Sequence, residues 1–268
     1  MLQRKKANSD EMIDVFVEFE ETFTADSGHS TIIPLNSEWK AVGIQLSGGL
    51  DSALLLYLTT LAIQKHNLDV KIQPLSVFIP SKVKNIASTV KIIDTIREIT
   101  GDTTIIQDGM VFRMPMEETS TQDGKKDGYF VKMIRQQFHD GVVSFEFNGN
   151  TKNPPDEARV GWKNDQHRQK NRDHAESIYN SMHSASPHYG MDKADIINMY
   201  LKYPELYEKV APLTCSCDEN VSVVDQNRTT VPCGNCWWCE ERNYGFSSNG
   251  VEDPAPILTY EEYCKLVD

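Results

Sequence analysis

One short segment constrains the fold of this chain more than any other. It separates the apolar run 41–46 from a leucine-rich run that begins at residue 53, so the order predicts a strand, a tight loop and a helix. The loop reads Ser47, Gly48, Gly49, Leu50, Asp51 and Ser52. Glycines let backbone amides approach an anion, and the N-terminus of the following helix favours negative charge. The segment therefore predicts a phosphate-binding loop, with a plain glycine turn as the alternative.

The loop also carries a family signature. It lacks the lysine of the Walker-type phosphate loop, and it resembles the Ser-Gly-Gly-x-Asp-Ser motif of the PP-loop ATP pyrophosphatases. Those enzymes cleave ATP between its α- and β-phosphates and adenylate an acceptor oxygen. The resemblance implies that residues 47–52 bind the phosphates of ATP. Asp51 is a candidate catalytic residue of this loop, because its carboxylate could hold Mg²⁺ or an attacking group.

Composition and charge narrow the class of protein. The chain has 268 residues and a net charge of -12, which argues against a broad basic face for nucleic acid and favours a small-molecule or protein substrate. No apolar run approaches the roughly 20 residues that a membrane helix needs. The basic start runs into polar residues, so it does not read as a secretory signal. We expect a cytoplasmic protein with no membrane partner.

The hydrophobic pattern predicts the fold class. Strands are expected at 41–46, 70–79, 103–107 and 142–147, and helices after 53 and at 82–99, 129–138 and 193–203. Asp192 is the expected N-cap of the last helix. This alternation predicts an α/β fold with a parallel, doubly wound, Rossmann-like sheet. Ligands of such sheets bind beyond the carboxyl ends of the strands, where Ser47 and the turns after Ile79 and Phe147 would lie.

The cysteines indicate a metal site. Five of the six fall between residues 215 and 239, a clustering that suits a metal better than disulfides. Tetrahedral zinc takes four thiolates, and Cys-x-x-Cys turns supply them without strain. The spacing predicts a structural zinc site formed by Cys215, Cys233, Cys236 and Cys239, with Cys217 as a spare. An iron–sulfur cluster and free thiols packed in a core are the alternatives.

These signals suggest three parts of the chain. We expect an N-terminal extension over 1–40, a nucleotide-binding α/β domain over 41–205 and a zinc-binding segment over 206–268. Polar stretches at 109–128 and 148–174 are expected at the surface. The second contains cations that could close over a triphosphate or a carboxylate, with a solvated surface as the alternative. They are Lys163, His167, Arg168, Lys170, Arg172 and His174.

The loop and the cysteines together resemble one enzyme family. The pattern is 213–215 Leu-Thr-Cys, 233–239 Cys-Gly-Asn-Cys-Trp-Trp-Cys and 245–246 Gly-Phe, with 193–197 Lys-Ala-Asp-Ile-Ile upstream. It is similar to 7-cyano-7-deazaguanine synthase, over residues 41–100 and 188–246. The resemblance implies an ATP-dependent carbon–nitrogen ligase that converts 7-carboxy-7-deazaguanine to its nitrile with ammonia. It also implies ATP, Mg²⁺ and Zn²⁺ as cofactors and a homodimer as a candidate assembly. Lys193 is then a candidate catalytic residue beside the phosphates, with a plain surface lysine as the alternative.

Two positions on the substrate side depart from that family. Residues 78–82 read Phe-Ile-Pro-Ser-Lys where the family has Asp-Tyr-Gly-Gln-Arg-His, and residues 148–155 read Asn-Gly-Asn-Thr-Lys-Asn-Pro-Pro where it has Ser-Gly-Tyr-Pro-Asp-Cys-Arg. Three hypotheses follow. The chain is this ligase, or it adenylates another acceptor such as a protein terminus, a different small acid or a tRNA base, or it is a non-catalytic nucleotide-binding module.

Overall fold

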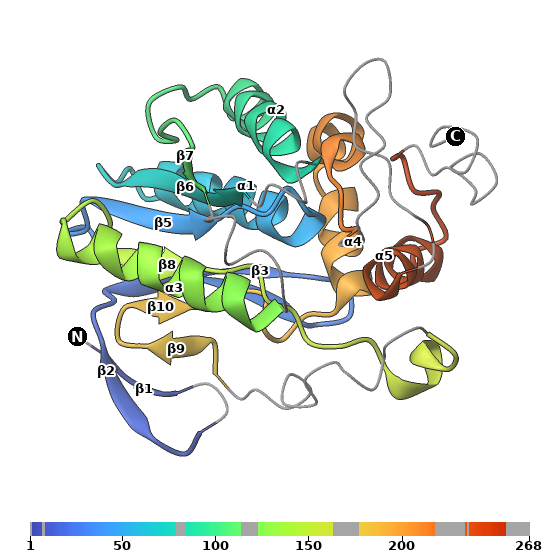
Figure 1. Ribbon diagram of the computed structural model, residues 1–268, viewed down its shortest axis with the longest axis horizontal. Coiled ribbons are helices and arrows are strands. Elements are labelled where there is room, and N and C mark those ends of the chain that lie inside the picture. Colours follow the sequence, from blue (N-terminus) through green and yellow to red (C-terminus); the bar gives the residue numbers. More distant parts are fainter. Residues whose placement is uncertain are drawn as a thin grey trace.

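The computed structural model of the protein describes residues 2–6, 9–78, 84–113, 123–162, 177–217, 234 and 236–255. A six-stranded sheet with the order β7-β6-β5-β8-β10-β9 forms its centre (Figure 1). The strands are β5 (Ala41–Gln45), β6 (Lys71–Phe78), β7 (Met110–Arg113), β8 (Phe145–Phe147), β9 (Tyr179–Ser181) and β10 (Ser184–Ala185). β9 pairs antiparallel, whereas the other pairings are parallel. The predicted parallel α/β sheet is confirmed.

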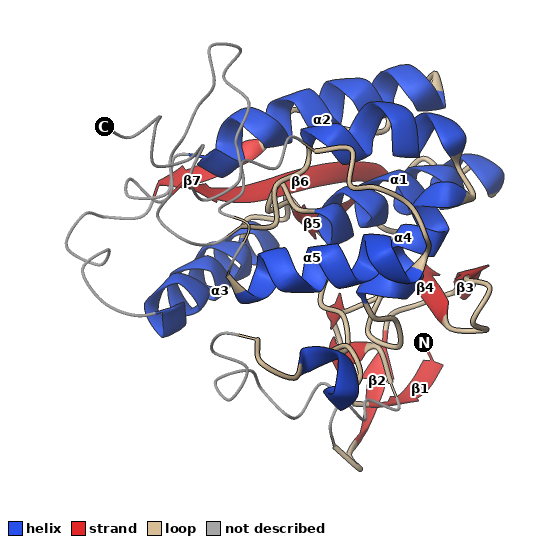
Figure 2. Cartoon of the chain, turned by 90° about the vertical axis from the view of Figure 1, so that its right-hand side faces the viewer, coloured by secondary structure: helices blue, strands red, loops and turns tan. Residues whose placement is uncertain are grey.

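Helices cover both faces of this sheet. They are α1 (Leu50–Lys65), α2 (Lys84–Thr100), α3 (Asp123–His139), α4 (Lys193–Leu201) and α5 (Trp237–Ser248). Figures 1 and 2 show α1 and α2 on one face and α3 on the other, which is the doubly wound arrangement. Short 3-10 and π turns complete the helical structure at Asp156–Arg159, Leu206–Val210 and Ala211–Leu213. α4 and α5 pack against each other beyond the end of the sheet toward which β5 points.

The strand order places a switch point beside β5. From β5 the chain adds β6 and then β7 on one side, and it returns to β8 on the other side of β5. Loops that leave neighbouring strands at such a point diverge and open a crevice, where α/β proteins bind their ligands. The phosphate loop, residues 47–52, follows β5, and the stretch 148–155 follows β8. The fold thus puts both at the expected position.

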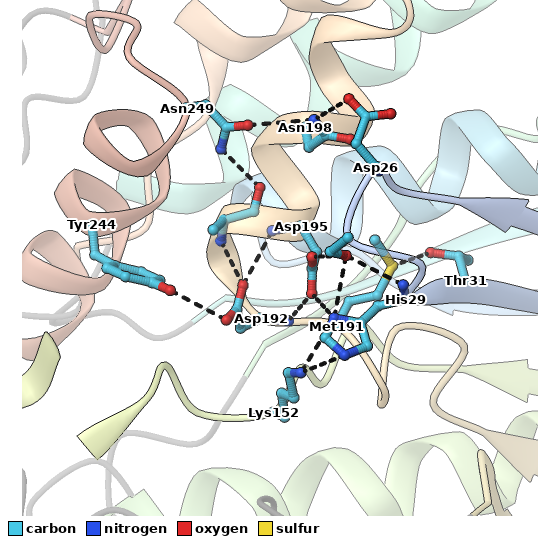
Figure 3. Close-up of polar contacts among 12 residues, drawn as sticks. Asp26, His29, Thr31, Lys152, Met191, Asp192, Asp195, Asn198, Tyr244 and Asn249 are labelled. Atoms are coloured by element: carbon cyan, nitrogen blue, oxygen red, sulfur yellow. Dashed lines mark hydrogen bonds and ion pairs between the residues drawn. The ribbon is translucent and has the colours of Figure 1, made fainter. Parts of the chain in front are cut away.

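The N-terminal residues add two antiparallel hairpins. β1 (Leu2–Lys5) pairs with β2 (Met12–Val15), and β3 (Phe19–Thr24) pairs with β4 (Ser30–Leu35). β4 packs on α1, and the buried side chains of both hairpins join the main hydrophobic core. The β3–β4 turn is also bonded to α4, because Asn198 Oδ1 accepts the amide of Asp26 at 2.9 Å (Figure 3). The expected extension therefore completes the core around α1.

One predicted strand is corrected. Residues 103–107 contribute only an isolated bridge between Ile106 and Ile72, and the strand that pairs with β6 is β7, at 110–113. The reason is local, because Asp102 Oδ1 accepts the amides of Thr104 and Ile105 and closes a turn there. The stretch 109–128, expected as a surface excursion, accordingly includes β7 and the start of α3.

Two expectations fall outside the described residues. The cationic cluster between 163 and 174 and the turn after Ile79 both lie there. Within the described part of the chain, no helix combines the length and apolarity needed to cross a membrane.

Candidate functional site

The phosphate loop is closed by its own hydroxyls. Ser52 Oγ accepts the amide of Ser47 at 3.2 Å and donates to the carbonyl of Gly49 at 3.2 Å. Gly48 has φ +82°, a left-handed conformation that favours glycine. Gly49 is the N-cap of α1, and no side chain among the described residues caps this helix. An uncapped helix N-terminus behind a tight glycine turn is a site for an anion.

The side chain of Asp51 meets a buried cation. Lys193 Nζ donates to both carboxylate oxygens of Asp51 at 2.6 Å, and it lies 3.6 Å from Glu241 Oε2. The capping box between Asp192 and Asp195 begins α4 and makes Lys193 its first residue. Lys193 is 1% exposed, which excludes the alternative of a surface lysine. The structure therefore brings together the two candidate catalytic residues of the sequence analysis.

Two buried side chains bind backbone carbonyls of the same turn. The Tyr200 hydroxyl donates to the carbonyl of Leu50 at 2.9 Å, and His188 Nε2 lies 3.1 Å from the carbonyl of Asp51. Burial raises the pKa of Tyr200, so its hydroxyl remains a donor. Leu50 is itself fully buried, so only its main chain can contact a ligand. The sequence analysis missed His188 and Tyr200, because a lone histidine and a helical tyrosine carry no motif.

The stretch after β8 borders the loop, as expected. A Cβ atom on Gly149 would lie 3.1 Å from the Ser52 amide nitrogen and 3.3 Å from Asp51 Cβ, so only glycine fits there without displacement. Further along, the Lys152 amide donates to the carbonyl of Met191 at 2.9 Å. Lys152 Nζ lies 3.2 Å from His29 Nε2, and His29 Nδ1 lies 2.9 Å from Asp195 Oδ2 (Figure 3). The substrate-side stretch thus brings a cation close to α4.

Three buried thiols form a candidate metal centre. Cys236 is the N-cap of α5, Cys239 lies in its first turn, and both approach Cys217. The Cys236 sulfur lies 3.5 Å from that of Cys239 and 3.9 Å from that of Cys217. Tetrahedral zinc with 2.3 Å bonds separates its sulfur ligands by about 3.8 Å, so the spacing fits. The neighbouring Cys217 raises the pKa of the Cys236 thiol above its usual value, and a bound metal would displace its proton.

The grouping of the sulfurs differs from the predicted ligand set at one position. Among the residues that the structure describes, Cys217, expected as a spare, belongs to the group of three sulfurs, whereas Cys215 is buried beside that group without belonging to it. The amide of Cys215 donates to the carbonyl of Gly48 at 2.8 Å, so its backbone is held at the phosphate loop. Cys217 lies two residues farther along and reaches the cluster. The fourth predicted ligand, Cys233, is outside the described residues.

Polar contacts connect the segment that carries these cysteines with the phosphate loop. Arg242 of α5 donates from Nη1 to Thr214 Oγ1 at 2.9 Å, and it pairs with Asp253 through Nη2 at 2.8 Å. Thr214 directly precedes Cys215, which is bonded to the phosphate loop. Arg242 and Asp253 are both almost fully buried. A continuous set of polar contacts therefore connects the cysteine-bearing helix with the residues that precede α1.

Comparisons with known proteins leave the family open. No protein-family model and no curated protein matches this chain. Among solved structures, it is similar to the U34-tRNA thiolase NcsA from Methanococcus maripaludis with its 4Fe-4S cluster, at 14% identity and a TM-score of 0.38. The match covers 65% of this chain and 61% of the thiolase. A similarity this remote assigns no function.

Protonation of His188 should destabilise the protein in mild acid. Burial is the main reason that its pKa is lowered to about 4 from the usual 6.5; the charge of Asp51 opposes the shift and that of Lys193 adds to it. The unfolded chain binds this proton at a higher pH than the folded protein does. The contribution of neutral His188 to the free energy of unfolding is therefore complete above about pH 6.5 and is lost as the pH falls toward 4. At 1.36 kcal/mol per pKa unit, the loss is about 3 kcal/mol.

Urea unfolding between pH 7 and pH 4 measures this effect. The variant His188→Asn should show a flatter dependence of the unfolding free energy on pH, whereas His139→Asn, which removes an exposed imidazole, should match the wild type. Equal slopes for wild type and His188→Asn would contradict the assignment.

The grouping of Cys217 with Cys236 and Cys239 predicts opposite results for two neighbouring cysteines. We expect Cys217→Ser to lose its bound metal, because the substitution removes one of the three clustered sulfurs. Cys215→Ser should retain about one ion per chain, since its sulfur lies outside that group. Elemental analysis of the purified variants measures the metal content. Loss of metal from Cys215→Ser with retention in Cys217→Ser would restore the original ligand set.

Proposed function

We propose that the chain is an ATP-dependent ligase that adenylates a carboxylate and passes the acyl group to ammonia. The observation that supports this most strongly is the pairing of Asp51 and Lys193 at the N-terminus of α1, beside the switch point of the sheet. A helix N-terminus, an oxygen ligand for Mg²⁺ and a buried cation together suit a polyphosphate. The loop signature of the PP-loop ATP pyrophosphatases supports cleavage between the α- and β-phosphates.

The residues would divide the chemistry as follows. Amides of the phosphate loop bind the β- and γ-phosphates, and Lys193 stabilises the charge that develops on the departing pyrophosphate. The Asp51 carboxylate, which is 24% exposed, is placed to hold Mg²⁺, an ion that neutralises phosphate charge. The acceptor carboxylate attacks the α-phosphorus, the α–β phosphoanhydride breaks and pyrophosphate leaves. Ammonia then attacks the acyl carbon, loses a proton and displaces AMP.

The sequence resemblance favours 7-carboxy-7-deazaguanine as the acceptor, with 7-cyano-7-deazaguanine as the product after the second dehydrating step. The stretch 148–155 lies against the loop and differs in sequence from that family. A specificity for another acceptor would therefore be encoded in this stretch. A protein terminus, a different small acid and a tRNA base are the other acceptors. The net charge of -12 argues against tRNA.

We propose a structural role for the cysteine centre. The sulfur atoms of Cys217, Cys236 and Cys239 are separated by distances that suit three corners of a tetrahedral zinc site. The sequence spacing supplies Cys233 as the fourth ligand. Four thiolates leave no open position for substrate, so zinc would stabilise the start of α5 rather than take part in the reaction.

Removal of the Asp51 carboxylate should abolish the reaction. The protein is incubated with ATP, Mg²⁺, ammonium and 7-carboxy-7-deazaguanine, and AMP, pyrophosphate and the nitrile are measured by mass spectrometry. We expect Asp51→Asn to lower AMP formation at least about 100-fold, because a metal ligand contributes several kcal/mol to the transition state. Asp69→Asn is the matched control, since Asp69 is exposed and precedes β6, whereas the phosphate loop follows the parallel strand β5 at the other end of the sheet.

The other outcomes identify the alternatives. AMP formation without nitrile would reject this acceptor and keep the adenylation chemistry. ATP binding without AMP, whatever acceptor is offered, would favour a nucleotide-binding module. Full activity of Asp51→Asn would show that the Asp51 carboxylate takes no part in catalysis and serves only as the partner of Lys193.

A further inference from the structure

A buried relay connects the N-terminal hairpin with the phosphate loop. Thr31, in β4, is fully buried, and its Oγ1 lies 2.7 Å from His188 Nδ1. His188 is also fully buried, and its Nε2 lies 3.1 Å from the carbonyl oxygen of Asp51. The three groups come from β4, from the stretch before α4 and from the first turn of α1. Segments more than 150 residues apart thus meet at one peptide group.

The direction of each hydrogen bond follows from the donors. A carbonyl oxygen only accepts, so His188 Nε2 must carry a proton. His188 is fully buried, which favours the uncharged ring, and in that ring Nδ1 is an acceptor because Nε2 carries the proton. The hydroxyl of Thr31 therefore donates to Nδ1. Met191 Sδ lies 2.9 Å from the same hydroxyl, but a thioether is the weaker acceptor (Figure 3).

This relay acts on a peptide plane that matters for anion binding. The carbonyl of Asp51 and the amide of Ser52 belong to one planar peptide group, so a hydrogen bond that holds the carbonyl also fixes the direction of the amide. Tyr200 holds the preceding plane in the same way, through the carbonyl of Leu50 and hence the amide of Asp51. Both amides lie in the first turn of α1, where the amides have no partner within the helix.

We propose that Thr31 and His188 are positioning residues of the nucleotide site, and that the β3–β4 hairpin is a working part of that site. Thr31 fixes the tautomer and orientation of His188, and His188 in turn aims the Ser52 amide at the phosphates. Neither residue touches the ligand. The inference rests on the proposed function, because it requires that the phosphate loop binds ATP.

Affinity for α,β-methylene-ATP with Mg²⁺, measured by calorimetry, tests the relay. Thr31→Val keeps the shape of the side chain and removes the donor, so we expect the dissociation constant to rise about 5- to 10-fold, the worth of one neutral hydrogen bond. Thr31→Ser restores the hydroxyl and should bind within about 2-fold of wild type. Thr59→Val is the matched control. Thr59 lies in α1 and is as fully buried as Thr31, and its hydroxyl has no hydrogen-bond partner among the described residues.

If Thr31 has a merely structural role, Thr31→Val should have a lower melting temperature but the same affinity for the analogue at 20 °C as Thr59→Val. That result would overturn the inference and leave the proposed function intact. If wild type itself does not bind the analogue, both fail. Should Thr31→Val not fold, Thr31→Cys carries the test, because its thiol is a weaker donor of similar size. The dissociation constant of Thr31→Cys should be higher than those of Thr31→Ser and Thr59→Val, by less than about 10-fold relative to wild type. A dissociation constant equal to that of wild type would reject the relay.

Discussion

The arrangement of the site depends on one buried cation. An ammonium group taken out of water costs several kcal/mol unless it is paired, and Lys193 is almost completely buried. Its partners are Asp51 on α1 and Glu241 on α5, so α4 must dock against both helices. Gly245 permits this contact, because a Cβ there would lie 2.7 Å from Lys193 Cγ. The ion pair therefore fixes the phosphate loop, the cation and the cysteine-bearing helix relative to one another.

Helix α5 and Cys215 link the cysteine cluster to the phosphate loop. α5 begins at the cysteine cluster, carries Glu241 toward Lys193 and packs on α4, while the amide of Cys215 bonds to the carbonyl of Gly48. A metal that orders the start of α5 would therefore stabilise two of the contacts that shape the anion site. From the opposite side, the β3–β4 hairpin reaches the first turn of α1 through His188. The site is enclosed by elements from both ends of the chain.

The sequence predicted what local patterns encode. Alternating apolar runs predicted the parallel sheet, and a glycine-serine loop between a strand and a helix predicted the candidate anion site. His188, Tyr200 and Gly149 could not be found this way, because their roles consist of contacts with a backbone distant in the sequence. Spacing alone also could not separate Cys215 from Cys217, since the choice depends on which backbone amide is bonded to Gly48.

The most direct test of the account is a crystal structure with α,β-methylene-ATP and Mg²⁺. We expect the β- and γ-phosphates to lie against the amides of Asp51 and Ser52, with Mg²⁺ near the Asp51 carboxylate and Lys193 beside the phosphates. A nucleotide bound elsewhere, with the loop empty and the pair of Asp51 and Lys193 unchanged, would contradict it.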